Sequence, residues 1–293
     1  MKIEIDNLSQ VYKNGKKALS DVNLEIGSGM FGLLGPNGAG KSSLMRILVT
    51  ILKPSIGHVK IDNYDLIKNR KEIRQMLGYL PQDFRFFSKL KTWEFLDYAA
   101  GLSGLTKKRE RAEKVDEWLE KVGLFDFRER DANKLSGGMK RRLGIAQALI
   151  GEPKIIVVDE PTTGLDPEER IRFRNILSEL SQKDVIIVLS THIVGDISSV
   201  CNDLALLNNG YVEFKGSPEE LVSMAKGHVW QVTTSGYEYD ILKDKYAVIS
   251  TIPTEEGWEV QLVGDTIEAK NAIEIEPNLE HAYVYYMEYL TKH

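Results

Sequence analysis

The chain has 293 residues, of which 42% are hydrophobic and 28% charged, and its formal net charge is −5 at pH 7. That balance is ordinary for a globular protein and argues against nucleic acid as a partner, which would need a basic surface. No uncharged apolar run reaches the ~20 residues of a membrane-spanning helix, and the amino terminus lacks the apolar segment of a signal peptide. The single cysteine, Cys201, excludes an internal disulfide and a cysteine-based zinc site. We therefore expect a cytoplasmic protein.

Charge is unevenly distributed along the chain. Residues 228–293 contain four Lys or Arg and twelve Asp or Glu, a net charge of −8, whereas residues 1–227 carry +3. Such a shift favours a domain boundary. We predict a main domain over residues 1–225 and a small acidic α+β domain over residues 226–293.

Apolar periodicity predicts the elements of both domains. The strands expected in the main domain are 3–12, 18–26, 30–34, 58–62, 77–81, 155–158, 185–189, 205–207 and 211–214. The helices expected there are 43–49, 92–102, 107–122, 138–149, 168–181 and 218–225. The C-terminal domain is expected to contain strands 229–233, 246–251 and 259–263 and a helix over 279–290. The runs 155–158 and 185–189 are apolar throughout, which is typical of strands buried on both faces of a parallel sheet.

A glycine-rich segment lies between a predicted strand and a predicted helix, with the spacing G-x-x-x-x-G-K-S of a phosphate-binding loop. Its glycines let the backbone wrap around phosphates, and N–H groups at the helix N-terminus are donors for the negative charge. Lys41 is expected to reach the β- and γ-phosphates, and the Ser42 hydroxyl to bind Mg²⁺. The predicted nucleotide-binding residues of the loop are Gly35, Pro36, Asn37, Gly38, Ala39, Gly40, Lys41, Ser42 and Ser43. The fold class expected is therefore α/β, with a P-loop NTPase core.

Two adjacent carboxylates, Asp159 and Glu160, follow the buried strand 155–158. Asp159 at the strand end is placed to hold Mg²⁺ through its water shell. Glu160, one residue further on, is placed to polarise a water molecule toward the γ-phosphate. Together with the phosphate-binding loop, this pair predicts hydrolysis of a nucleoside triphosphate.

The pentapeptide Leu135-Ser-Gly-Gly-Met139, just before a predicted helix, resembles the L-S-G-G-Q signature of the ATP-binding-cassette (ABC) family. The resemblance covers roughly residues 1–225 and implies an ATPase with an antiparallel β subdomain and a helical insert at about 84–145. In that family the signature acts on ATP held by the other subunit. Ser136, Gly137 and Gly138 are therefore expected to contact the nucleotide of a second copy of the chain, in a homodimer that encloses two ATP molecules.

Four further residues match motifs of the family in the same order. The resemblance implies that Gln82 contacts Mg²⁺ or the attacking water and faces the membrane partner. It implies that Asp166 lies at the dimer interface and that His192 touches the γ-phosphate. Tyr12 stands where the family places an aromatic ring that stacks on adenine.

The resemblance also suggests an exporter, which needs a separate transmembrane permease and would hold the chain on the inner face of the cell membrane. Met139 replaces the glutamine of the common signature, but the small residues before it retain the phosphate contacts, so we expect activity to survive. L-S-G-G-M followed by basic residues is similar to exporter ATPases of the nodulation-factor and drug-efflux type, and segment 277–286 to tails of the drug- and sodium-efflux type. An apolar cluster after Gln82 is interpreted either as a permease contact or as core of the insert, and its members are Phe84, Phe86, Phe87 and Leu90.

Two alternative functions belong to other classes of protein. A soluble ABC protein of translation would usually carry two cassettes, whereas this chain has one phosphate-binding loop. An ABC protein that acts in DNA maintenance would carry long coiled coils or zinc-binding cysteines. A regulator that binds ATP without hydrolysing it is disfavoured by the presence of both Glu160 and His192.

Overall fold

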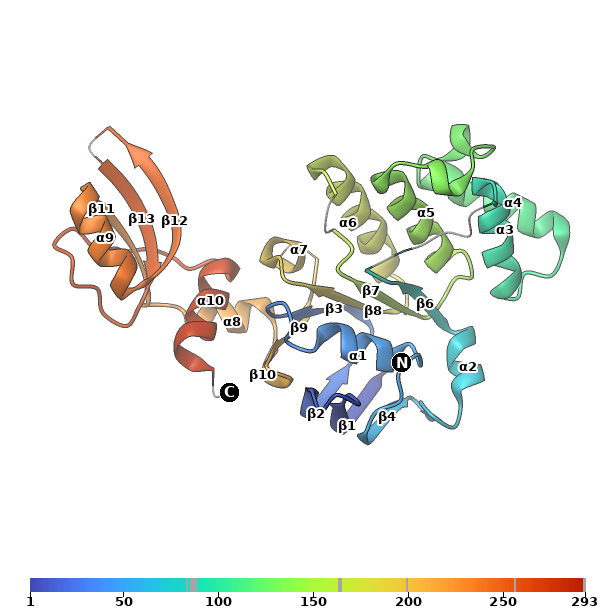
Figure 1. Ribbon diagram of the computed structural model, residues 1–293, viewed down its shortest axis with the longest axis horizontal. Coiled ribbons are helices and arrows are strands. Elements are labelled where there is room, and N and C mark those ends of the chain that lie inside the picture. The colour runs from blue at the N-terminus through green and yellow to red at the C-terminus, as the bar shows by residue number, and fades with distance from the viewer. Residues whose placement is uncertain (83, 85–88, 163–164, 199, 256, 292–293) are drawn as a thin grey trace.

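The computed structural model describes residues 1–293 except 83, 85–88, 163–164, 199, 256 and 292–293. The molecule is elongated, with a small β-rich part at one end and a larger α/β part at the other (Figure 1). The described residues form three sheets. In these residues, no helix has both the length and the apolar character needed to cross a bilayer.

The first sheet is antiparallel, with the strand order β2-β1-β4-β5. Its strands are β1 (Ile3–Val11), β2 (Lys17–Ile26), β4 (Ile56–Ile61) and β5 (Tyr64–Asp65). The turn between β1 and β2 contains Gly15 at φ 82°, a left-handed conformation that glycine adopts at little cost. The pair Asn14-Gly15 at this turn is a combination that strongly favours a β-hairpin.

The central sheet has six strands in the order β10-β9-β3-β8-β7-β6. They are β3 (Gly29–Leu34), β6 (Leu77–Leu80), β7 (Ile155–Asp159), β8 (Ile186–Thr191), β9 (Asp203–Asn208) and β10 (Tyr211–Gly216). All neighbouring pairs are parallel except β9 and β10. The carboxyl ends of β3, β7 and β8 therefore lie side by side, which brings the residues that follow them together.

Alternate residues of the central strands belong to two different cores. Ile155 and Val157 of β7 pack with α1 (Lys41–Leu48) and the antiparallel sheet, whereas Ile156 and Val158 pack with the helices of the opposite face. Those helices are α3 (Thr92–Leu102), α4 (Lys108–Lys121), α5 (Gly137–Leu149), α6 (Pro167–Ser181), α7 (Val194–Ser198) and α8 (Pro218–Met224). Strands buried on both faces account for the uninterrupted apolar runs.

The C-terminal sheet has the order β12-β13-β11-β14. Its elements are β11 (Val229–Thr234), α9 (Gly236–Lys245), β12 (Ala247–Thr254), β13 (Gly257–Val263), β14 (Ile273–Glu274), α10 (Leu279–Tyr285) and a π-helical turn, Tyr286–Leu290. One face packs on Leu242 of α9, and the other packs on α10. Helix α10 also packs against α7 and α8 of the larger part.

The α/β fold with a P-loop core is confirmed, and the predicted elements agree with the observed ones to within a few residues. Among the α-helices and strands of the described residues, five were not predicted: β5, α2 (Arg70–Gln75), α7, α9 and β14. Four of them are six residues or shorter, and α2 and α9 each bury a single side chain, Ile73 and Leu242. Elements this short or this exposed carry little apolar periodicity. The division of the chain at residue 226 stays a prediction.

Candidate functional site

Lys41 is the first residue of α1, directly after the loop that follows β3. Its ammonium group donates to the carbonyl oxygens of Gly35 at 2.7 Å and Pro36 at 3.2 Å. Gly40 has φ 111°, and a Cβ atom there would lie 2.4 Å from the Ala18 carbonyl oxygen. The loop therefore folds back on the Lys41 ammonium group, and position 40 requires glycine.

A cavity of about 290 Å³ opens beside this loop. Among its lining residues are Tyr12, Asn37, Gly38, Gly40, Lys41, Ser42, Ser43, Gln82 and Glu160. The Tyr12 hydroxyl lies 3.0 Å from the Ser43 hydroxyl oxygen, so the ring is held at the edge of the loop. Most of the predicted nucleotide-binding residues thus share one cavity with Tyr12, Gln82 and Glu160.

Asp159 ends β7 and is almost completely buried. Its Oδ1 accepts from the Ser190 hydroxyl at 2.6 Å and from the Ser42 hydroxyl at 3.4 Å. A carboxylate and a hydroxyl that meet in this way are the hard oxygen ligands that suit Mg²⁺. On neighbouring β6, burial and the Asp159 carboxylate raise the pKa of Tyr79 to about 12, so the phenol stays protonated.

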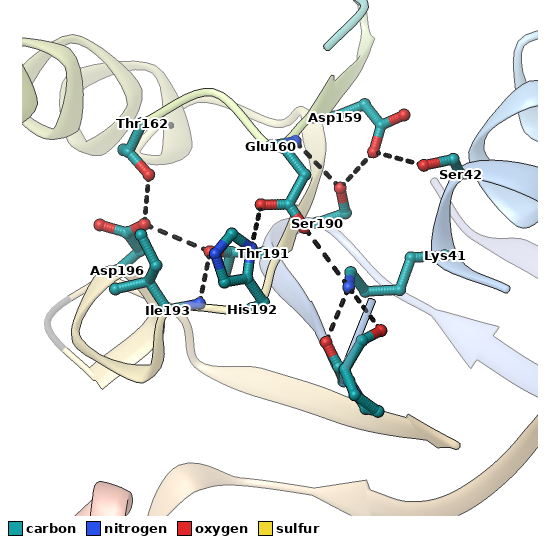
Figure 2. Close-up of polar contacts among 12 residues, drawn as sticks. Lys41, Ser42, Asp159, Glu160, Thr162, Ser190, Thr191, His192, Ile193 and Asp196 are labelled. Atoms are coloured by element: carbon teal, nitrogen blue, oxygen red, sulfur yellow. Dashed lines mark hydrogen bonds and ion pairs between the residues drawn. The ribbon is translucent and has the colours of Figure 1, made fainter. Parts of the chain in front are cut away.

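Glu160 is held between two partners (Figure 2). One carboxylate oxygen lies 3.3 Å from the Lys41 ammonium nitrogen, and the other lies 2.7 Å from Nδ1 of His192, the residue just past the end of β8. Glu160 is only 4% exposed. Its φ of 48° is left-handed, a conformation that a glutamate rarely adopts and that surrounding contacts must maintain.

A third buried carboxylate, that of Asp196 on α7, contacts the segments that carry this pair. It accepts from the Thr162 hydroxyl and, at 3.3 Å, from the Thr191 hydroxyl, which itself accepts from the Ile193 N–H at 2.9 Å. These contacts join the chain after Glu160 to the chain around His192. Asp196 was missed in the sequence because nothing local distinguishes it from a surface acid.

Ser136 is the N-cap of α5, and its hydroxyl accepts from the Met139 N–H at 3.3 Å. A Cβ atom built on Gly137 would meet nothing within 4 Å, and one on Gly138 would lie 3.9 Å from the nearest atom. Neither glycine has a left-handed φ. The fold itself therefore does not require these glycines. Met139 packs against the helical core, so the signature is ordered without a glutamine.

Asp166 caps α6 by accepting from the Glu169 N–H at 2.9 Å. This bond gives Asp166 a structural role in addition to the interface role that the resemblance implies. Gly164, two residues before it, lies outside the described residues.

The structure assembles Lys41, Ser42, Asp159, Glu160 and His192, but it does not bring the signature residues to the same cavity. Helix α5, which Ser136 caps, lies on the face of the central sheet opposite α1. Within one chain the two motifs therefore belong to opposite faces of the central sheet.

This arrangement is that of a P-loop nucleotide-binding protein. The family model described as "ABC transporter" matches residues 19–163. YxlF of Bacillus subtilis (strain 168), an ABC transporter ATP-binding protein, is 36% identical, and the match covers 79% of this chain and 76% of YxlF. The chain belongs to the ABC transporter ATP-binding proteins, and it is an ATPase of that family.

Other proteins are similar over much of the same region. The probable multidrug ABC transporter ATP-binding protein YbhF of Escherichia coli (strain K12) is 37% identical over 75% of this chain, which spans only 38% of YbhF. The dimeric structure of MJ0796, a bacterial ABC transporter cassette, is 29% identical with a TM-score of 0.68, and the match covers 73% of this chain and 98% of that one. MJ0796 is also known as a dimer in a post-hydrolysis state with ADP and Pi.

Proposed function

We propose that this chain is the ATP-hydrolysing subunit of an exporter, and that two copies close around two ATP molecules to drive a separate membrane permease. The observation that carries the proposal is the separation of two half-sites. Lys41, Glu160 and His192 form one, and the open glycines that follow Ser136 form the other, on the opposite face of the sheet.

In this proposal each residue in and beside the cavity has one task. Lys41 and the loop N–H groups hold the phosphates, and the ring of Tyr12 lies against adenine. Ser42 and Asp159, with Gln82, would hold Mg²⁺, which screens phosphate charge when bound. Glu160 accepts a proton from the attacking water, while His192 keeps its carboxylate oriented.

The second half-site supplies what the first lacks. Ser136 and the first N–H groups of α5 form an uncovered helix N-terminus, where donors and the helix dipole favour a phosphate. Gly137 and Gly138 leave room for the phosphate to approach the backbone. Because α5 and the phosphate-binding loop of the same chain lie on opposite faces of the sheet, we propose that Ser136 contacts the nucleotide held by a second copy. Asp166 would then lie at the interface between the two copies. The dimer of MJ0796 supports this arrangement.

A groove of about 830 Å³ between α2, β6, α3 and α5 is the proposed permease site. It begins at Phe84, two residues after Gln82, and Phe84 meets Phe95 edge-on at a centroid distance of 6.0 Å. Tyr98 and Leu102 on its wall are 51% and 73% exposed. These apolar side chains suit a helix inserted from a membrane partner.

Phe84 also packs on the helical core, as does Leu90, so both interpretations of the apolar cluster after Gln82 apply to Phe84. Phe86 and Phe87 lie outside the described residues.

The export direction is supported by the similarity to YbhF, a probable multidrug transporter protein. Docking on a permease would place the chain at the inner face of the cell membrane. For residues 226–293 we propose a separate domain that stabilises or regulates the dimer, because its sheet has a core of its own.

The proposal is tested by purifying the tagged chain from detergent-solubilised membranes of its own cell. We expect a stoichiometric polytopic membrane protein to co-purify, and Leu102→Glu to abolish that association. Ile171→Glu, on exposed α6 outside the groove, is the matched control and should retain it. Recovery of the wild-type chain only from the soluble fraction, alone or with ribosomes or DNA, would overturn the transporter assignment.

A further inference from the structure

One buried guanidinium connects three parts of the site. Arg141, on the second turn of α5, is 9% exposed. Its three nitrogens donate to five backbone carbonyl oxygens at 2.8–3.2 Å, those of Pro81, Gln82, Asp159, Glu160 and Pro161. Arginine is the one side chain whose planar fork of five N–H donors can satisfy so many acceptors.

Three of those carbonyls belong to successive residues around Glu160. They converge on one donor group because the backbone turns at Glu160, where φ is 48°. Only surrounding contacts can maintain a glutamate in that conformation. The guanidinium therefore fixes the backbone that aims the Glu160 carboxylate between Lys41 and His192.

The other two carbonyls belong to Pro81 and Gln82, at the end of β6. Gln82 lines the nucleotide cavity, and Phe84, two residues further on in the sequence, lines the groove. The two segments on either side of the guanidinium are far apart in sequence. A displacement of one segment relative to the other would strain the hydrogen bonds that both make to this shared group.

We propose that Arg141 is a positioning residue for hydrolysis, which sets Glu160 and Gln82 relative to each other and transmits movement at the groove to the catalytic carboxylate. Its own position on α5 adds the signature helix to the same unit. The inference rests on the proposed role of Glu160. Arg141 acts on the step after ATP binding, because the contacts of Lys41 with Gly35 and Pro36 do not involve it.

The test compares Arg141→Lys with Arg111→Gln in the purified full chain. Lysine keeps the buried cation but cannot bridge five carbonyls. We expect kcat for ATP to fall roughly 100-fold, as misplacement of a catalytic group by about 1 Å can cause, while KM and direct ATP binding change less than about threefold. Arg111 contacts Asp97 and the Leu105 carbonyl, away from the site, so its loss should lower thermal stability and leave kcat unchanged.

A second variant, Arg141→Ala, distinguishes loss of the guanidinium from misfolding. Arg141→Ala leaves a space for methylguanidinium, and we expect millimolar methylguanidinium, but not ethylammonium, to raise its kcat. Unchanged kcat in Arg141→Lys would overturn the inference, as would parallel loss of ATP binding and kcat that methylguanidinium does not reverse. Glu160→Gln is measured alongside. If that variant turns over normally, the proposed role of Glu160 fails, whereas an inactive Glu160→Gln with a normal Arg141→Lys rejects only the role of Arg141.

Discussion

Nδ1 of His192 lies 2.7 Å from one oxygen of Glu160, whose other oxygen lies 3.3 Å from the Lys41 ammonium nitrogen. Because each oxygen of the carboxylate has its own partner, the group is held in a single orientation. Phosphates that bind at the loop would compete with Glu160 for Lys41, so nucleotide binding opposes the Glu160–Lys41 ion pair and favours release of that carboxylate oxygen. The imidazole then remains as the group that keeps Glu160 in place.

Glu160→Gln should separate binding from chemistry. The amide keeps the size of the side chain but cannot take a proton, so we expect phosphate release to fall roughly 100-fold or more. ATP binding should persist, and the variant should elute as a dimer with ATP in size-exclusion chromatography. Glu168→Gln, in the exposed first turn of α6, is the control with normal turnover. Normal turnover in Glu160→Gln would exclude it as the base.

Mixing two inactive variants should restore activity. Lys41→Ala disables the loop and Ser136→Arg disables the signature, but a mixed dimer combines the intact loop of one copy with the intact signature of the other. Random pairing gives roughly a quarter of wild-type turnover. A mixture of Lys41→Ala with Glu160→Gln should stay inactive, because both residues belong to the same half-site. Equal results for the two mixtures would contradict a composite site.

Gly137→Ala should leave the fold intact and impair function. There is space for the methyl group and the φ of Gly137 is not left-handed, so alanine fits without strain and the free energy of unfolding should stay the same or rise. ATP hydrolysis should fall roughly 10-fold or more if a phosphate must approach this N–H. Gly236→Ala, at the equivalent position of α9 and with equal space, should keep full activity. Loss of stability in Gly137→Ala would mean that the glycine serves the fold.

The C-terminal part should lose stability in mild acid. His281 is buried, its Nδ1 accepts from the Asn278 N–H at 3.2 Å, and burial lowers its pKa below the usual 6.5. On acidification the unfolded chain takes up the proton first, so the stabilising contribution present above pH 6.5 is lost as the pH falls through the lower folded value. Thermal melts of the wild type should therefore decline from pH 7 to 5.

His281→Gln should flatten this dependence, because glutamine can accept the same N–H without titrating. His58→Gln, at an exposed position on β4, should leave the decline unchanged. An identical decline in His281→Gln would assign the effect to other groups.

Motifs that are contiguous in the chain could be predicted from the sequence, whereas contacts between distant segments could not. The loop ending at Lys41 and Ser42 carries its whole geometry in eight residues, and Asp159 and Glu160 are marked by the apolar strand before them. Arg141 and Asp196 act through residues far from them in sequence, so their neighbours give no indication of their partners. In the sequence, Arg141 was only one of three basic residues after the signature.

The packing of α10 has a mechanical consequence. The chain leaves the larger part after α8, forms the C-terminal sheet, and returns through α10 to pack on α7 and α8. The sheet is therefore attached by an outgoing and a returning segment, so it cannot swing as a body on a single hinge without first detaching α10. Helix α7 carries Asp196, which is bonded to Thr191, the neighbour of His192. Movement of the C-terminal sheet would therefore shift α7 through α10, and with it the segment that carries His192. A sheet held in place would restrain that segment.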